Sequence, residues 1–220
     1  LIFFIIGSLL GSYHFEFWTN LPSIGGFSLL NSFSKTKAIL IQLSLLTLIY
    51  IFISRLDFNR NNKIIHSDIV SNSSHNFIRG PWPLLWGAIS LVFFSFLMLQ
   101  AAGHPWSVTF AFGLWGAKIA SAIGIDVASW FYWQLEYPST ALENSVLADP
   151  TTVSNIGIIL GALIGSALSG KISNFSSVNK KLILAAVIGG LFMGYGARLA
   201  FGCNIGALFG GIASGSLHGW

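Results

Sequence analysis

Apolar residues form long, nearly uninterrupted stretches along this chain, as is typical of helices embedded in a bilayer. Three of these stretches, 38–54, 83–101 and 154–170, approach the roughly 20 residues that an α-helix needs to cross the hydrocarbon core. A fourth stretch, 189–220, is longer and rich in glycine. Residues 1–13 are apolar but too few to cross alone, so we expect them to be the end of a helix that starts upstream.

Basic residues gather in two polar stretches, 55–80 and 171–181, which the positive-inside rule predicts to be cytoplasmic loops. The stretch 134–153 carries three acidic residues and no basic one, which favours the external side. The apolar segment 107–125 follows the chain-breaking sequence Gly-His-Pro-Trp. With this topology, residues 107–133 form either a re-entrant hairpin or two crossings.

Composition places the whole chain in the membrane class. Hydrophobic residues make up 54% of the 220 residues and charged residues 8%, whereas soluble domains carry about 25% charged residues. The net charge of +4 is scattered and forms no basic stripe, which argues against nucleic acid as a partner. We therefore predict one membrane domain over 1–220. Its fold class is an all-α polytopic membrane protein with glycine-rich helices and re-entrant or broken helices.

Several classes of chemistry have no support in the sequence. A single cysteine permits no internal disulfide and no CxxC motif, and the five scattered histidines show no metal-ligand spacing. No phosphate-binding loop or serine or cysteine triad is present. The sequence therefore predicts no cofactor, no metal and no enzymatic activity.

Glycines four residues apart recur in the apolar stretches. This spacing lets helix backbones approach closely where no hydrophobic effect acts between helices, so we expect these glycines to form packing surfaces. They are Gly7 and Gly11, Gly157, Gly161 and Gly165, Gly190 and Gly194, Gly206 and Gly210, and Gly211 and Gly215. The aromatic sequence Trp-Phe-Tyr-Trp at 130–133 is a candidate for an interfacial aromatic belt.

The candidate chemistry lies in Gly-Ala-Arg-Leu-Ala-Phe-Gly-Cys-Asn at 196–204. An anion that crosses a membrane needs positive charge or helix N-termini along its path, and Arg198 is always protonated. Gly202 is a point at which a helix could break and present backbone N–H groups to a cavity. The thiol of Cys203 is soft and polarisable, which suits a terminal sulfur atom better than an oxygen. Asn204 adds a further donor.

Each candidate also has a structural interpretation. A buried cysteine often acts as a small hydrophobic residue, and Asn204 could cap the helix after the break. Lys118 is a second candidate cation for the path, but it could instead extend to the interface or neutralise Asp126. His218, near the C-terminal tryptophan, is a candidate for substrate contact or for a structural role.

Four motifs together resemble one known family, the YeeE/YedE family of sulfur-compound membrane transporters. They are RGPWPLLWGAISL at 79–91, AGHPWSVTFAFGLWGAK at 102–118, GIDVASWFYW at 124–133, and GYGARLAFGCNIGALFGGIASGSLHGW at 194–220. The resemblance implies a multi-pass protein of the inner (plasma) membrane, built from two related halves with re-entrant helices. It also implies import of thiosulfate or a related sulfur or selenium species, often beside a small cytosolic sulfur-carrier protein.

On this resemblance the chain corresponds to the C-terminal portion of the family pattern, and the first half-repeat with its cysteines lies upstream of Leu1. We then expect this chain alone not to complete a transport pathway. The function predicted is transport of a small thiosulfate-like anion through a path lined by Cys203 and Arg198. The alternative is a membrane docking or redox partner of a cytosolic sulfur-carrier protein, without transport.

Overall fold

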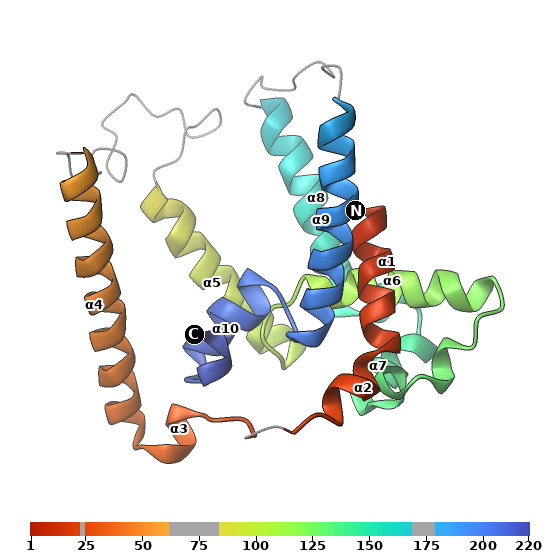
Figure 1. The fold of residues 1–220 in the computed structure, drawn as a ribbon, viewed down its shortest axis with the longest axis horizontal. Helices are drawn as coiled ribbons and strands as arrows, with labels where there is room; N and C mark the ends of the chain where they lie inside the picture. The colour runs from red at the N-terminus through yellow and green to blue at the C-terminus, as the bar shows by residue number, and fades with distance from the viewer. Residues whose placement is uncertain (23–24, 62–83, 169–178) are drawn as a thin grey trace. The chain divides into compact units, whose positions relative to one another are not determined.

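The computed structural model describes residues 1–22, 25–61, 84–168 and 179–220 (Figure 1). These residues form helices, and the one β-type pairing among them is an isolated antiparallel bridge between Ser28 and Ser216. In chain order the elements are α1 (Ile2–Tyr13), α2 (Phe15–Thr19), α3 (Leu29–Ser32), α4 (Lys35–Asn61), α5 (Leu84–Ala102), α6 (Thr109–Ala122), η1 (Val127–Ser129), η2 (Phe131–Gln134), α7 (Glu136–Glu143), η3 (Val146–Ala148), α8 (Pro150–Leu168), α9 (Lys180–Leu199), η4 (Asn204–Phe209), α10 (Gly210–Ala213) and η5 (Leu217–Gly219).

Four helical stretches in the described part of the chain are long and apolar enough to cross a membrane. They are Lys35–Asn59 in α4, Leu84–Ala102, Pro150–Leu168, and Lys180–Ala213, which runs from α9 into α10. The prediction of an all-α, multi-pass membrane protein is confirmed. Helix α4 continues to Asn61, so the predicted polar loop 55–80 is helical at its start. The rest of that loop, and 171–178 of the second basic stretch, lie outside the described residues.

The described elements fall into two compact units, which we treat separately. The first contains α1, α2, α6, η1, η2, α7, η3, α9 and η4, together with α8 as far as Leu163. The second contains α3, α4, α5, the end of α8, and the chain from Gly211 to Trp220.

In the first unit, α1 and α9 lie side by side through their glycines. A Cβ atom added at Gly194 would overlap the carbonyl oxygen of Phe4 and lie 2.8 Å from the backbone nitrogen of Ser8. A Cβ added at Gly7 would overlap the carbonyl oxygen of Leu191. The predicted glycine packing is confirmed for this helix pair. By contrast, nothing in the described structure lies within 4 Å of a Cβ built at Gly157, Gly161 or Gly165.

We expect Gly194→Ala to lower the thermal stability of the detergent-solubilised protein, because the new methyl group forces α1 and α9 apart. Overpacking of this kind costs about 1–3 kcal/mol. Gly157→Ala is the matched control, since the same methyl group there meets open space. Equal melting temperatures for the two variants would show that the α1–α9 approach is not needed for stability.

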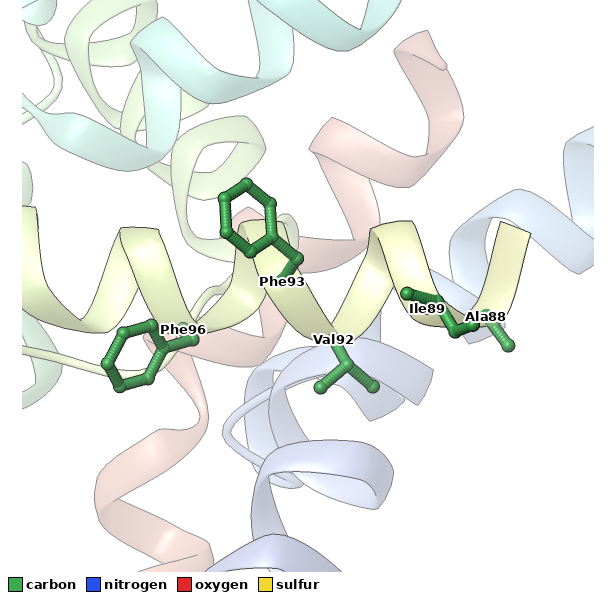
Figure 2. A pocket seen from close by; sticks show the side chains of 5 residues that line it. All are labelled: Ala88, Ile89, Val92, Phe93 and Phe96. Carbon is green, nitrogen blue, oxygen red and sulfur yellow. The ribbon is translucent and has the colours of Figure 1, made fainter. Parts of the chain in front are cut away.

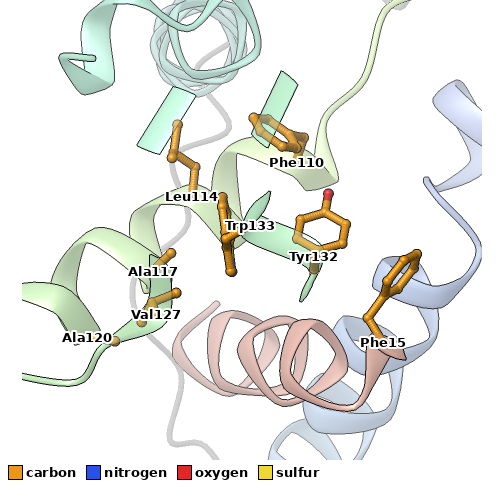
Figure 3. Packing of buried hydrophobic residues seen from close by; sticks show 8 residues of the cluster. All are labelled: Phe15, Phe110, Leu114, Ala117, Ala120, Val127, Tyr132 and Trp133. Atoms are coloured by element: carbon orange, nitrogen blue, oxygen red, sulfur yellow. The ribbon is translucent and has the colours of Figure 1, made fainter. Parts of the chain in front are cut away.

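The hydrophobic core of the first unit forms around one face of α6. Phe110, Leu114 and Ala117 on this helix pack against Tyr132 and Trp133 of η2 (Figure 3). Tyr132 and Trp133 are 4% and 1% exposed, so the interpretation of residues 130–133 as an interfacial belt is wrong for these two residues. Helix α6 has only 14 residues, about 21 Å, which is shorter than the hydrocarbon core.

Asp149 fixes the junction between α7 and α8. Its carboxylate precedes α8 and accepts hydrogen bonds from the Thr151 hydroxyl, from the Thr152 hydroxyl and backbone N–H, and from the Tyr137 hydroxyl. Burial raises the pKa of Tyr137 above its ordinary value, and the bond to Asp149 raises it further. The tyrosine therefore stays protonated and continues to donate. Asp149 acts as an N-terminal cap and is saturated with donors.

In the second unit, the C-terminal turn is tied to α3 and α4. Leu29 donates its backbone N–H to the carbonyl of Gly215 at 2.8 Å, and the Gln42 side chain donates to the carbonyl of Ile212, also at 2.8 Å. Gly215 has a φ of 69°, a conformation that favours glycine. Helix α5, by contrast, presents apolar side chains such as Val92, Phe93 and Phe96 along an open surface (Figure 2). Such a surface suits contact with lipid.

Candidate functional site

The glycine-rich segment predicted to carry the chemistry does contain a break in the helix. Helix α9 ends at Leu199, and two hydrogen bonds close its last turn: Gly202 N–H to the Ala197 carbonyl, at 3.0 Å, and Phe201 N–H to the Arg198 carbonyl, at 3.4 Å. This pair is the Schellman motif. The left-handed position that usually holds glycine is occupied by Phe201, with a φ of 52°. A bulky residue in this region costs about 1–3 kcal/mol, and such strain clusters at functional sites.

Cys203 lies in the extended link between the two helical segments. Its carbonyl accepts hydrogen bonds from the N–H groups of Ala207, at 2.8 Å, and Leu208, at 3.2 Å, and so begins the π-helical segment η4. Wide turns of this kind are frequent at functional sites. The side chain is half-buried and forms no disulfide, and within the described residues its sulfur has no hydrogen-bond partner.

Gly202 allows the chain to turn back on itself at this link. A Cβ atom at this position would lie 2.7 Å from the backbone nitrogen of Ala207, closer than real Cβ atoms come. Any larger residue would push the first turn of η4 away from the end of α9. Gly202 is therefore needed for the geometry around Cys203, although it is Phe201 that carries the positive φ.

Arg198 is 5% exposed and points from α9 into the core of the first unit. Its Nε and Nη2 atoms donate to the Ser8 hydroxyl on α1, at 3.2 and 2.8 Å, and its Nη1 donates to the Tyr132 hydroxyl of η2. The guanidinium carbon also lies 4.5 Å from the centre of the Tyr132 ring, and 5.9 Å from those of Phe110 and Trp133. Arg198 therefore joins α1, α6, α9 and η2.

All of these partners of Arg198 are neutral. No carboxylate among the described residues bonds to the guanidinium, so hydroxyl groups and aromatic rings alone stabilise its charge. An unpaired buried charge is costly, and hydroxyls and π faces offset only part of that cost. The site consequently keeps a net positive charge that favours an anion nearby.

The other predicted site residues are placed differently. Asn204 is exposed and is the first residue of η4, whose N-cap is Cys203, so the structural alternative in which Asn204 caps this helix does not hold. The Lys118 ammonium group donates to the carbonyl of Asn144 at the end of α7, a bond that favours a structural role over pairing with Asp126. His218 is exposed and belongs to the second unit. Of the predicted set, Arg198 lies in the last turn of α9, and Gly202 and Cys203 follow in the link to η4.

A second irregular segment lies beside η4. A Cβ built at Gly206 would be 3.7 Å from the Trp106 carbonyl oxygen and from the Ser107 hydroxyl, both of which precede α6. The Asn155 side chain on α8 donates to the carbonyl of Val108 at 2.8 Å and so secures this segment. Two helix starts, those of α6 and η4, are thus close to one another in the first unit.

Sequence reasoning missed Ser8, Tyr132 and Gly113, the three residues that surround the Arg198 guanidinium. Only Tyr132 had a local signal, its place inside the aromatic sequence 130–133. Ser8 lies 190 positions from Arg198 in the sequence, so no local pattern connects them. No group of three or more histidine, cysteine or acidic side chains in the described ranges could hold a metal ion.

The profile of one protein family, described as sulphur transport, matches residues 1–220, which is the entire chain. The chain belongs to the sulphur transport family. This comparison agrees with the resemblance to the YeeE/YedE family. The last motif of that resemblance contains the helix break before Cys203 and the buried Arg198. Membership of this family and the four candidate spans point to a membrane protein of sulfur transport.

Relatives of known name agree with this assignment. The chain is 32% identical over 118 residues to the probable transporter YedE of Escherichia coli (strain K12), and 33% identical over 118 residues to that of Salmonella typhimurium. It is 42% identical over 65 residues to the thiosulfate transporter TsuA of Spirochaeta thermophila. These matches cover 54%, 54% and 30% of this chain, but only 28%, 28% and 20% of the relatives. No solved structure matches the chain.

Proposed function

We propose that this chain forms part of a transport path for a small sulfur-containing anion of the thiosulfate type, with Cys203 and Arg198 at that path. The observation that carries the proposal is the buried guanidinium of Arg198, which in the described part of the chain bonds only to neutral groups. Arg198 lies in the last turn of α9, five residues before Cys203 in the link that follows. Membership of the sulphur transport family and the likeness to a thiosulfate transporter support the choice of substrate.

The two side chains would have different tasks. Arg198 is buried among its partners, so it acts through its field, which lowers the electrostatic barrier for an anion at membrane depth. Cys203 is half-buried and its thiol is unpaired in the described structure, so it can donate a weak hydrogen bond to the terminal sulfur of the anion. Sulfate has no such atom. The Arg198 charge together with the Cys203 thiol therefore favours thiosulfate over sulfate.

The remaining features of the proposal concern the surroundings of this pair. Gly202 lets the chain turn sharply before Cys203, and Asn204 is proposed as a further contact along the path. We propose that α6 is a re-entrant element and α9–η4 a broken helix, in one half of a two-fold repeated fold in the inner membrane. A small cytosolic sulfur-carrier protein is the proposed recipient of the imported sulfur.

Growth on thiosulfate tests the proposal. The full-length gene product is expressed in a bacterial strain that lacks its own sulfate and thiosulfate uptake systems, with thiosulfate as the only sulfur source. We expect growth with the gene product and none with the empty vector, and cysteine in the medium should restore both cultures equally. Equal failure of the two cultures on thiosulfate, at verified expression of the protein in the membrane, would refute thiosulfate import.

A further inference from the structure

The Arg198 guanidinium lies directly against the backbone of α6 at Gly113. A Cβ atom added at Gly113 would overlap Nη2 of Arg198 and would lie 2.7 Å from its Cζ atom and 2.9 Å from the Ser8 hydroxyl. Gly113 itself is buried in the middle of α6. Glycine at this position is needed for space, because every other residue would occupy the volume that the guanidinium fills.

Three elements thus enclose one charged group. Ser8 on α1 accepts from two nitrogens of the guanidinium, and Tyr132 of η2 accepts from the third while its ring faces the Cζ atom at 4.5 Å. The backbone of α6 at Gly113 covers a further side of the guanidinium. An arginine side chain has many rotamers. Because no carboxylate of the described residues bonds to Arg198, neutral contacts select one of these rotamers.

We propose that Gly113, Ser8 and Tyr132 are positioning residues that fix the Arg198 charge at one point next to the break before Cys203. The inference rests on the proposed function for its consequence in transport, but its geometric part stands on the contacts alone. Displacing the guanidinium from Gly113 breaks its bonds to Ser8 and moves the charge relative to the path, because the same Nη2 atom makes the bond and meets the glycine.

A double-mutant cycle tests the proposal in the full-length gene product. The variants are Gly113→Ala, Arg198→Lys and the double mutant, with Gly196→Ala as the control on α9, where an added Cβ meets nothing within 4 Å. We expect Gly113→Ala to raise the apparent KM for thiosulfate uptake about fivefold or more and to lower the Tm by several degrees. In the Arg198→Lys background the same substitution should have little effect, because a lysine ends in a single nitrogen and has no atom at the position of Nη2.

The two readouts separate the inference from the proposed function. Equal losses of Tm from Gly113→Ala in both backgrounds would overturn the positioning role, as would an unchanged KM in Gly113→Ala. If the wild-type protein takes up no thiosulfate, the proposed function fails, and the coupling in Tm still decides the inference. If Gly113→Ala does not accumulate in the membrane, the membrane level of the double mutant decides the inference. A level equal to that of Arg198→Lys supports it, and failure of the double mutant to accumulate contradicts it.

Discussion

Replacing Arg198 with alanine is expected to reduce thiosulfate uptake about a hundredfold. The estimate follows from the cost of an uncompensated charge at the bilayer centre, about 2.5–3.5 kcal/mol on insertion scales, which the guanidinium offsets for the anion. Arg198→Lys should impair uptake less than Arg198→Ala, because the charge is kept while the bonds to Ser8 and Tyr132 are lost.

A loss of uptake in Arg198→Ala has a competing structural explanation, since alanine also leaves a cavity and two unpaired hydroxyls in the core. Arg198→Met separates the two explanations. Methionine fills a similar volume without charge, so it leaves no cavity and removes the cost of a buried cation. That gain offsets the loss of the bonds to the two hydroxyls. We expect Arg198→Met to melt close to the wild-type temperature and to take up little thiosulfate. Near-normal uptake by this variant would mean that thiosulfate uptake does not depend on the positive charge of Arg198.

Cys203→Ser is expected to leave expression in the membrane and the melting temperature nearly unchanged, while strongly reducing thiosulfate-dependent growth. The substitution changes the volume of the side chain only slightly, and in the described structure no hydrogen bond to the sulfur is lost. The hydroxyl, however, is a hard group that replaces the soft thiol opposite the terminal sulfur of the anion.

Cys203→Ala provides the matched comparison. If the cysteine acts only as a small hydrophobic residue, alanine and serine should both retain uptake, with a modest loss of stability for each. If the thiol contacts the substrate, both variants should lose uptake at matched expression, whatever their stability. Wild-type uptake in Cys203→Ser would assign the residue to packing and leave only the family membership to support transport.

The membrane-spanning helices could be predicted from sequence because their signal is local. Long apolar stretches gave the spans in α5 and α8 to within a few residues, and the spacing of Gly7, Gly11, Gly190 and Gly194 gave the surfaces that join α1 to α9. Helix α4 proved longer than predicted, because Leu56 and Phe58 continue the helix past the first basic residue of the polar stretch.

The site could be predicted only in part, for a physical reason. The break near Gly202 and the importance of Arg198 follow from residue types within one short segment. The partners of Arg198 come from α1, α6 and η2, and only tertiary packing brings these elements to α9. The aromatic residues Tyr132 and Trp133 are equally suited to an interface and to a core, so their sequence alone could not decide between the two.

We propose that thiosulfate crosses the membrane past Cys203, and uptake by the purified protein shows whether it does. The full-length gene product and its Cys203→Ser variant are reconstituted into liposomes at equal density, and the entry of radiolabelled thiosulfate is measured beside that of radiolabelled sulfate. We predict that the wild-type protein admits thiosulfate well in excess of sulfate and that the variant admits neither above the level of empty liposomes. Equal thiosulfate uptake by wild type and variant, or equal uptake of the two anions by the wild type, would contradict the claim.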